Sequence, residues 1–214
     1  YYEIAENAFR FNGNSGIGIT NINYVSGDSD QLENFTIEAK IKASSEGDNS
    51  KQRIILSFDR SSVFRFGIGS DDNSIKSAAA GKLSFSFTNS DGTHDKYDAG
   101  YNGNLKDDQW HDIMIHFEAN KPYGLNYYVD GVLTYSDPNP YAPIGNQTTS
   151  ETPRYGIVGN GSESAAPSGR MSPDDPFIGR IREIKMRYYP ISLSSSPTDI
   201  SLSSTTVLEN VSNS

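Results

Sequence analysis

Short segments in which hydrophobic and polar residues alternate run through most of this sequence. In the segment 34–44 (NFTIEAKIKAS), Phe35, Ile37, Ala39 and Ile41 share one parity, and polar or charged residues occupy the other. Successive side chains of a strand point to opposite sides, so this alternation predicts a strand with one buried face. Similar patterns recur in further segments, at 53–58, 63–69, 82–88 and 110–118. None of them carries a helical stripe, and an all-β fold is therefore predicted.

Local signals indicate how the strands are connected. Asp130-Gly131 divides the segment 125–135 (LNYYVDGVLTY) into two alternating halves. Asp-Gly at such a point predicts a β-hairpin, because a type I′ turn needs positive φ at both central residues. Asp91-Gly92 predicts another hairpin tip, and a parity shift between Ile181 and Ile184 predicts a β-bulge. Many short strands joined by turns are typical of an antiparallel sandwich or barrel, and 214 residues fit one such domain.

The acidic composition argues against several partners and chemistries. The formal net charge is −9, and the sequence has no cysteine. Binding to a nucleic-acid backbone needs clustered Lys and Arg, so no nucleic-acid partner is expected, whereas acidic loops attract cations. The lack of cysteine excludes disulfides and thiolate metal sites. No apolar run reaches membrane-spanning length, so membrane insertion is not expected. Because the first residue is Tyr1, we expect the chain to be a piece of a longer protein.

Composition also predicts the loops and a domain boundary. The segments 136–154 and 160–176 are rich in Pro, Gly, Ser, Asn and Asp, as long surface loops are. After Pro190 the sequence becomes rich in Ser and Thr. We therefore expect one domain at 1–192, followed at 193–214 by a linker or by the start of another repeat.

The order of the segments resembles a known superfamily. Six segments carry the resemblance, at 8–20 (AFRFNGNSGIGIT), 33–44 (ENFTIEAKIKAS), 107–118 (DDQWHDIMIHFE), 125–135, 155–161 (YGIVGNG) and 175–192 (DPFIGRIREIKMRYYPIS). Together they resemble the laminin-G-like, concanavalin A-like lectin and pentraxin superfamily. The resemblance implies a jelly-roll sandwich of two antiparallel sheets that binds glycans or proteins at one rim, frequently through calcium.

The end of the chain has a resemblance of its own. The segment 197–214 (PTDISLSSTTVLENVSNS) is similar to the opening of a cadherin-like repeat of large bacterial surface adhesins. It implies a secreted or cell-surface protein, with a glycan on a cell or matrix surface, or alternatively a protein, as its partner.

Acidic and amide residues in the loops are candidate calcium ligands. Calcium takes about six to eight oxygen ligands, but no segment here has the spacing of an EF-hand loop, and a single acidic turn is more often only solvated. If the strands are antiparallel neighbours, one rim gathers acidic residues from distant segments. The predicted metal ligands are Asn89, Asp91, Asp95, Asp174 and Asp175. The acidic ligand that the superfamily typically places before the strand at Val63 is replaced here by Ser61 and Ser62.

Sugar binding needs an aromatic platform with polar groups beside it. The predicted ligand-binding residues are Tyr97, Tyr141, Asn160 and Arg170. Trp110 is interpreted as a core residue, and His111 as a structural residue of its strand. Glucan-cutting relatives carry two carboxylates on one strand, and no Glu-x-Asp-x-Glu or Glu-x-Glu pattern occurs here. The sequence therefore predicts a non-catalytic, calcium-assisted lectin-like module, with a protein-binding module, a structural spacer or a polysaccharide-degrading enzyme as alternatives.

Overall fold

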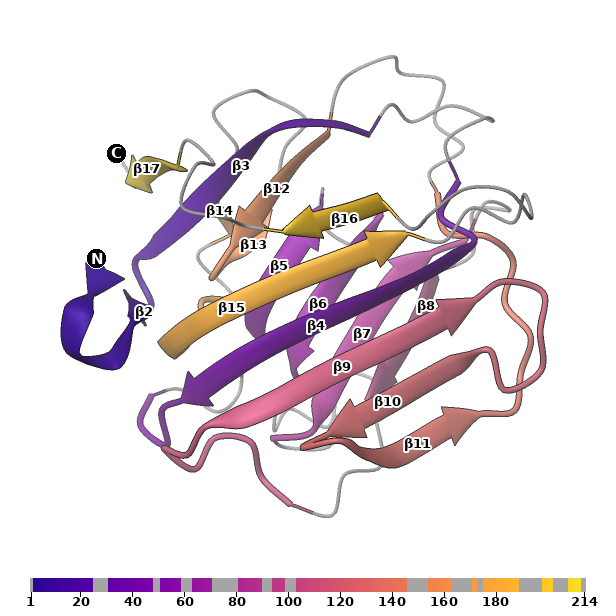
Figure 1. Cartoon of the computed structure of the whole chain (residues 1–214), viewed down its shortest axis with the longest axis horizontal. Helices are drawn as coiled ribbons and strands as arrows, with labels where there is room; N and C mark the ends of the chain where they lie inside the picture. The colour runs from indigo at the N-terminus through magenta and orange to yellow at the C-terminus, as the bar shows by residue number, and fades with distance from the viewer. Residues whose placement is uncertain are drawn as a thin grey trace.

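The computed structural model describes residues 2–24, 31–47, 51–58, 63–70, 81–89, 94–98, 103–145, 154–162, 171–172, 175–188, 198–201 and 208–212. Within them the chain forms two large antiparallel sheets that pack face to face (Figure 1). The prediction of an all-β sandwich is confirmed, and the only helix in these residues is the short 3₁₀ helix η1 (Ile4–Glu6). No helix in the described parts of the chain is long and apolar enough to cross a membrane.

Sheet A is the front layer of Figure 1. Its strands are, in spatial order, β1 (Tyr2–Glu3), β2 (Ala8–Asn12), β15 (Ile178–Tyr188), β4 (Asn34–Ala43), β9 (His111–Glu118), β10 (Leu125–Val129) and β11 (Val132–Asp137), with β16 (Thr198–Ser201) also paired to β15. Neighbours far apart in sequence, such as β15 and β4, lie side by side, which is how a jelly roll closes one core.

Sheet B is the rear layer. Its strands are, in spatial order, β17 (Leu208–Ser212), β3 (Ser15–Tyr24), β12 (Arg154–Val158), β5 (Arg53–Phe58), β6 (Phe64–Ile68), β7 (Leu83–Thr88) and β8 (His94–Asp98). A separate two-stranded sheet consists of β13 (Gly161–Ser162) and β14 (Met171–Ser172). The segment expected to be a linker or the start of a repeat thus supplies β16 to sheet A and β17 to sheet B, while the boundary near residue 192 stays a prediction.

The alternating residues form the core between the sheets, as the sequence predicts. Phe35, Ile37 and Ile41 on β4 are completely buried. The ring of Phe35 lies 6.3 Å from that of Phe64 and 6.2 Å from that of Phe85, both on the opposite sheet. Aromatic contacts of this kind bury much area per residue, so a chain with few aliphatic residues still has a large core.

The predicted turns and bulge are also present. Asp130 and Gly131 have φ values of 52° and 77°, the pair of positive angles that a type I′ hairpin needs. The register between β15 and β4 shifts between Ile181 and Glu183, which confirms the bulge. β7 and β8 pair as an antiparallel hairpin, and the tip with Asp91-Gly92 lies outside the described residues.

Trp110 does not belong to the core, contrary to the prediction. It lies partly exposed just before β9, and the guanidinium carbon of Arg182 lies 4.3 Å from its ring centroid. Arg182 is the extra residue at the bulge of β15, and it is free of the regular pairing there. A cation over an indole ring is favourable at the surface, which explains why this large side chain is not fully buried.

Candidate functional site

The outer face of sheet A carries polar side chains from neighbouring strands in direct register. Lys40 on β4 lies opposite Glu183 of β15 on one side and opposite Asp112 of β9 on the other. Glu38, two residues earlier, lies opposite Lys185 of β15 and Met114 of β9, and Met114 in turn pairs with Tyr128 of β10. Directly paired residues point to the same side of a sheet, so these rows form one continuous surface.

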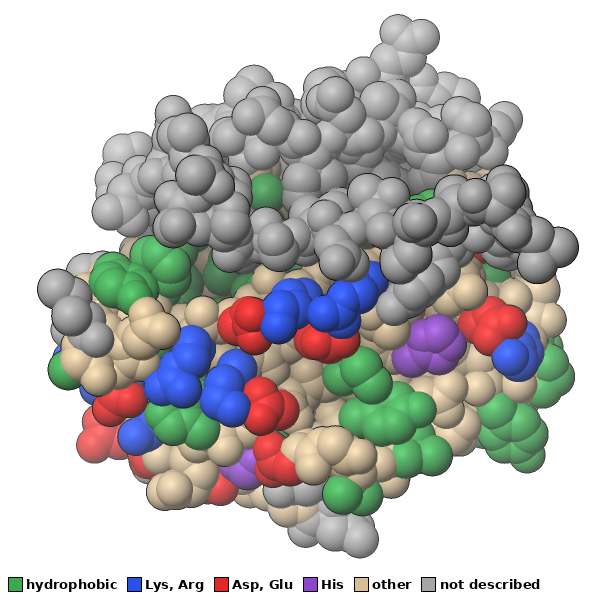
Figure 2. Space-filling view, viewed as in Figure 1, with side chains coloured by type: hydrophobic (Ala, Val, Ile, Leu, Met, Phe, Trp, Pro, Cys, Tyr) green, Lys and Arg blue, Asp and Glu red, His purple; other side chains and the backbone are tan. Residues whose placement is uncertain are grey.

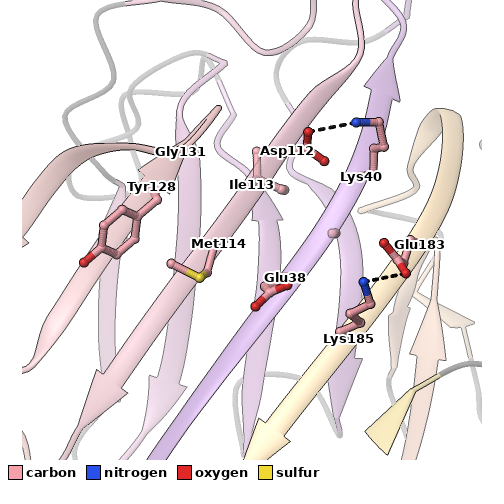
Figure 3. Close-up of a pocket in the computed structure, with 10 residues that line it drawn as sticks. Glu38, Lys40, Asp112, Ile113, Met114, Tyr128, Gly131, Glu183 and Lys185 are labelled. Atoms are coloured by element: carbon pink, nitrogen blue, oxygen red, sulfur yellow. Dashed lines mark hydrogen bonds and ion pairs between the residues drawn. The ribbon is translucent and has the colours of Figure 1, made fainter. Parts of the chain in front are cut away.

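A groove of about 300 Å³ crosses this surface. Its walls come from four strands and one turn, and consist of Glu38, Ala39, Lys40, Asp112, Ile113, Met114, Tyr128, Gly131, Glu183 and Lys185. Figure 3 shows the side chains of Tyr128 and Met114 along one side and the charged side chains of β4 and β15 along the other. The groove therefore has an apolar side and a side rich in hydrogen-bonding groups.

Ion pairs fix the charged side of the groove. The Nζ of Lys40 lies 2.8 Å from Oδ2 of Asp112, and the Nζ of Lys185 lies 2.6 Å from Oε1 of Glu183. Glu38 accepts a hydrogen bond from Arg187. Each pair is partly exposed and contributes little to stability, but it limits the rotamers of its side chains. The groove thus offers ordered carboxylate acceptors and ammonium donors to a ligand.

These carboxylates are poorly arranged for glycoside hydrolysis. Such catalysis uses one carboxyl group that stays protonated as the acid and a second that acts as base or nucleophile. A protonated acid is usually kept in apolar surroundings, whereas Glu38, Asp112 and Glu183 each have a cationic partner. The geometry favours hydrogen bonding to a polar ligand over proton transfer.

His111 anchors the hairpin at the end of the groove. Its Nδ1 lies 2.8 Å from Oδ2 of Asp130, and its Nε2 lies 3.2 Å from Oδ2 of Asp107. Asp130 also accepts a hydrogen bond from the backbone N of Asp112 at 2.9 Å. Burial of the ring lowers the pKa of His111, but the hydrogen bonds to Asp130 and Asp107 outweigh it, so the pKa is raised above 6.5. Both nitrogens have carboxylate partners, in agreement with the predicted structural role.

The structure separates two of the predicted calcium ligands. The carbonyl oxygen of Asp175 accepts from the backbone N of Ile54 near the start of β5, and its carboxylate lies 2.8 Å from Nη1 of Arg65. Asn89 is buried and follows the end of β7, where it bridges to Ile144. β5, β6 and β7 are antiparallel in turn, so the start of β5 and the end of β7 are at opposite ends of the sheet. Asn89 and Asp175 therefore do not fit one ion.

The other predicted ligands can be placed only in part. Asp91 and Asp174 lie outside the described residues, and of Asp95 only the backbone is described, in β8 opposite Phe87. Among the residues that the structure describes, no group of three or more His, Cys, Asp or Glu side chains could hold a metal ion. The calcium site thus stays a prediction.

Two of the predicted sugar-binding residues are buried. Tyr141 is 7% exposed, and its ring packs edge-on against Phe87 at 5.4 Å, so it is a core residue and offers no platform to a ligand. Asn160 is 1% exposed, and its Oδ1 accepts from the backbone N of Gly161. Of Tyr97 only the backbone in β8 is described, and Arg170 lies outside the described residues.

Sequence reasoning did not find the groove. Its polar residues occupy the solvent-facing positions of ordinary alternating strands, where charge is expected in any antiparallel sheet. Lys40 and Asp112 are 72 positions apart in the chain, and only the register of β4 and β9 brings them together. The one available signal is Tyr128, an aromatic residue at an outward position of β10.

Comparisons with known proteins agree with this architecture. The family model of the concanavalin A-like lectin/glucanases superfamily matches residues 12–195. No curated protein matches the chain at a significant level.

Several solved structures share the fold at low sequence identity. The chain is similar to domains LG4-5 of the mouse laminin α1 chain, with a TM-score of 0.54 and 14% identity over 96% of this chain and 48% of that one. It is similar to the binding domain of Paraclostridial Mosquitocidal Protein 1, with a TM-score of 0.54 and 14% identity over 85% of this chain and 39% of that one. A candidate carbohydrate binding protein from Bacteroides ovatus gives a TM-score of 0.50 and 16% identity over 84% and 44%. The chain thus spans less than half of each of these structures.

Proposed function

Because the chain belongs to the concanavalin A-like lectin/glucanases superfamily, we propose that it is a non-catalytic carbohydrate-binding module that holds a glycan in the groove on the outer face of sheet A. The observation that carries the proposal is the composition of the groove. Tyr128 and Met114 provide an apolar side for the C–H face of a sugar ring, and the ion pairs opposite them provide partners for its hydroxyl groups. A concave site with few, well-placed polar groups is the usual form of a small-ligand site.

The sugar platform can be tested by removing one ring. A glycan array identifies ligands for the wild type, and calorimetry then compares Tyr128→Ala with the wild type on one of them. Aromatic contacts contribute about 0.5–1.5 kcal/mol beyond area burial, so we expect affinity to fall by roughly three-fold or more.

The matched control is Tyr123→Ala, which removes a tyrosine that is 61% exposed and does not line the groove. Affinity should stay unchanged in this variant. Equal affinity of Tyr128→Ala and wild type would contradict the proposed platform. Release of reducing ends from common polysaccharides would contradict the non-catalytic part of the proposal.

Calcium assistance is a separate part of the proposal. It depends on the loop residues Asp91, Asp95 and Asp174, and it is supported by the acidic charge of the chain and by the preference of calcium for carboxylate oxygens. We expect EDTA to weaken glycan binding and added calcium to raise the melting temperature, because a ligand of the native state stabilises it. If neither glycan affinity nor the melting temperature changes with calcium, calcium plays no part in the proposed function.

The proposed setting is a secreted or cell-surface adhesin. The resemblance of the segment 197–214 to a cadherin-like repeat supports it, as does the similarity of the fold to laminin LG domains. In this setting the module attaches a cell to surface glycans.

One observation favours a protein partner as the second candidate. The edge strand β11 exposes Val132 and Leu133, which are 63% and 50% accessible. Exposed apolar residues on a sheet edge suit the addition of an extended peptide as a further strand. Two results together would favour this alternative. The glycan array would give no hits, and a display library would yield peptides that bind the wild type but not Leu133→Lys.

A further inference from the structure

Three cations stand side by side in one row of sheet A. Arg180 of β15 lies directly opposite Arg10 of β2 and directly opposite Lys42 of β4. Directly opposed residues in antiparallel strands are about 5 Å apart, and like charges at that distance destabilise a sheet. Blue side chains gather over this part of the sheet, where β15 begins and β4 ends (Figure 2). The row thus concentrates positive charge on a chain whose net charge is −9.

One carboxylate of the chain, that of Glu3, lies against this row. Glu3 of β1 accepts a hydrogen bond at Oε2 from Nε of Arg180 at 2.6 Å, with Oε1 3.4 Å from Nη2. The hydrogen bond from Arg180 lowers the pKa of Glu3, and the charges of Arg10 and Lys42 lower it further. All three cations thus act on the carboxylate of Glu3.

A hollow of about 190 Å³ lies beside this contact. It is lined by Arg10, Phe11, Asn12, Lys42, Ser44, Glu46, Asp108, Ile178, Gly179 and Arg180. Glu3 does not line it, so the cations face both Glu3 and the hollow. Its size suits a single sugar unit.

The lining of the hollow also carries hydrogen-bond acceptors. Hydrogen bonds from the side chain and backbone of Ser45 hold the carboxylate of Asp108 in place and lower its pKa, and the charge of Lys42 lowers it further. The buried guanidinium of Arg53 binds the carbonyl oxygens of Ser44 and Glu46, which holds that segment in place. A lining that combines three cations with the held carboxylate of Asp108 matches a ligand with one anionic group and several hydroxyl groups. A densely sulfated polymer would meet repulsion from Glu46 and Asp108.

We propose that this hollow is a second subsite that binds the carboxylate-bearing unit of an acidic glycan on Arg10, Lys42 and Arg180, with Glu3 as an internal carboxylate that competes for the same cations. This inference rests on the proposed carbohydrate-binding function and narrows its substrate class to glycans that contain uronic acids or similar sugars. The subsite lies on the same face of sheet A as the groove, and both are bordered by β4 and β15, so one chain of sugars can reach both.

The test compares each acidic glycan with its neutral derivative. Oligomers of galacturonate and of glucuronate are each paired with their methyl esters, and dissociation constants are measured by calorimetry at low salt. We expect the wild type to prefer at least one acid over its ester. Lys42→Gln should abolish the preference, and this variant should fold, because Lys42 has no hydrogen-bonded carboxylate partner among the described residues. Arg180→Gln should have the same effect, with its melting curve as a check on folding.

Glu3→Gln is the decisive variant. It keeps the size of the side chain but removes the competing charge, so affinity for the acidic oligomer should rise by about two- to five-fold, the range of one exposed ion pair, while affinity for the ester stays constant. The matched control is Glu118→Gln, which removes a carboxylate that lies 2.6 Å from Lys121, away from the hollow. It should change neither affinity.

Two results would overturn the subsite. One is equal affinity of the wild type for acids and esters, and the other is an acid-to-ester ratio that Glu3→Gln and Lys42→Gln leave unchanged. Neither result contradicts the proposed function itself. A neutral glycan whose binding depends on Tyr128 would still support the groove, whatever the ratio of affinities for acid and ester.

Discussion

Gly179 lies where β15 passes close to the backbone of β4, and its replacement by alanine gives a sharp test of the sheet geometry. A Cβ atom at this position would lie 2.3 Å from the carbonyl oxygen of Lys42 and 2.9 Å from Cα of Ala43. Both are backbone atoms within a paired strand, so neither can rotate away. The φ of Gly179 is +142°, a value that residues with a side chain rarely adopt.

Two contributions set the magnitude. The unfavourable φ costs about 1–3 kcal/mol for a residue other than glycine. Forcing an extra carbon into a packed site costs about 1–3 kcal/mol more. We therefore expect Gly179→Ala to lower the free energy of unfolding by about 2–6 kcal/mol. In a domain of this size, each kcal/mol lost lowers the melting temperature by roughly 2–4 °C.

The control is Gly131→Ala in the hairpin turn. Gly131 also has a positive φ, +77°, but a Cβ there would meet nothing within 4 Å. This variant carries only the conformational cost, about 1–2 kcal/mol. Urea unfolding followed by circular dichroism gives both values. If Gly179→Ala destabilises the protein no more than Gly131→Ala does, the close approach of β15 and β4 is incorrect.

Two further predictions concern the core and the hairpin. Phe35→Ala should lower the free energy of unfolding by about 3–5 kcal/mol, because the ring is completely buried and contacts both sheets, whereas Phe35→Leu should cost clearly less in the same urea titration. The raised pKa of His111 means that its ion pairs stabilise the folded state fully below about pH 6.5, and that this contribution is lost as the pH rises through the folded-state pKa. The melting temperature of the wild type should therefore exceed that of Asp130→Asn by the largest margin at low pH. If the margin instead grows from about pH 6 to pH 8.5, the ion pairs of His111 do not stabilise the folded state in this way.

Sequence predicted the elements well because their signals are local. The parity of Phe35, Ile37 and Ile41 alone identifies the buried face of β4, and Asp130-Gly131 alone identifies a hairpin. The bulge of β15 is also visible locally, because the buried hydrophobic residues change parity between Ile181 and Ile184. These features need no knowledge of which strand lies beside which.

The candidate sites depend on which distant strands lie side by side, and local sequence patterns do not predict that pairing. Asn89 and Asp175 were expected at one rim, yet the order of β5, β6 and β7 places them at opposite ends. Tyr141 follows a proline in a segment of loop composition, but the loop folds back and buries its ring against Phe87. The groove and the cationic row both arise from residues that are unremarkable within their own strands and become neighbours only through register.

The bulge in β15 makes the two hollows of sheet A separately adjustable. Arg180, before the bulge, belongs to the cationic row, and Glu183 and Lys185, after it, belong to the groove. Deletion of the extra residue, Arg182, would restore regular pairing with Glu183 still opposite Lys40 and Ile184 still opposite Ala39, so the strand can change in length at this point without moving the residues of either hollow. The residues that line one hollow do not line the other. Related chains can thus diverge in ligand preference one hollow at a time, through changes that never disturb the packing between the sheets.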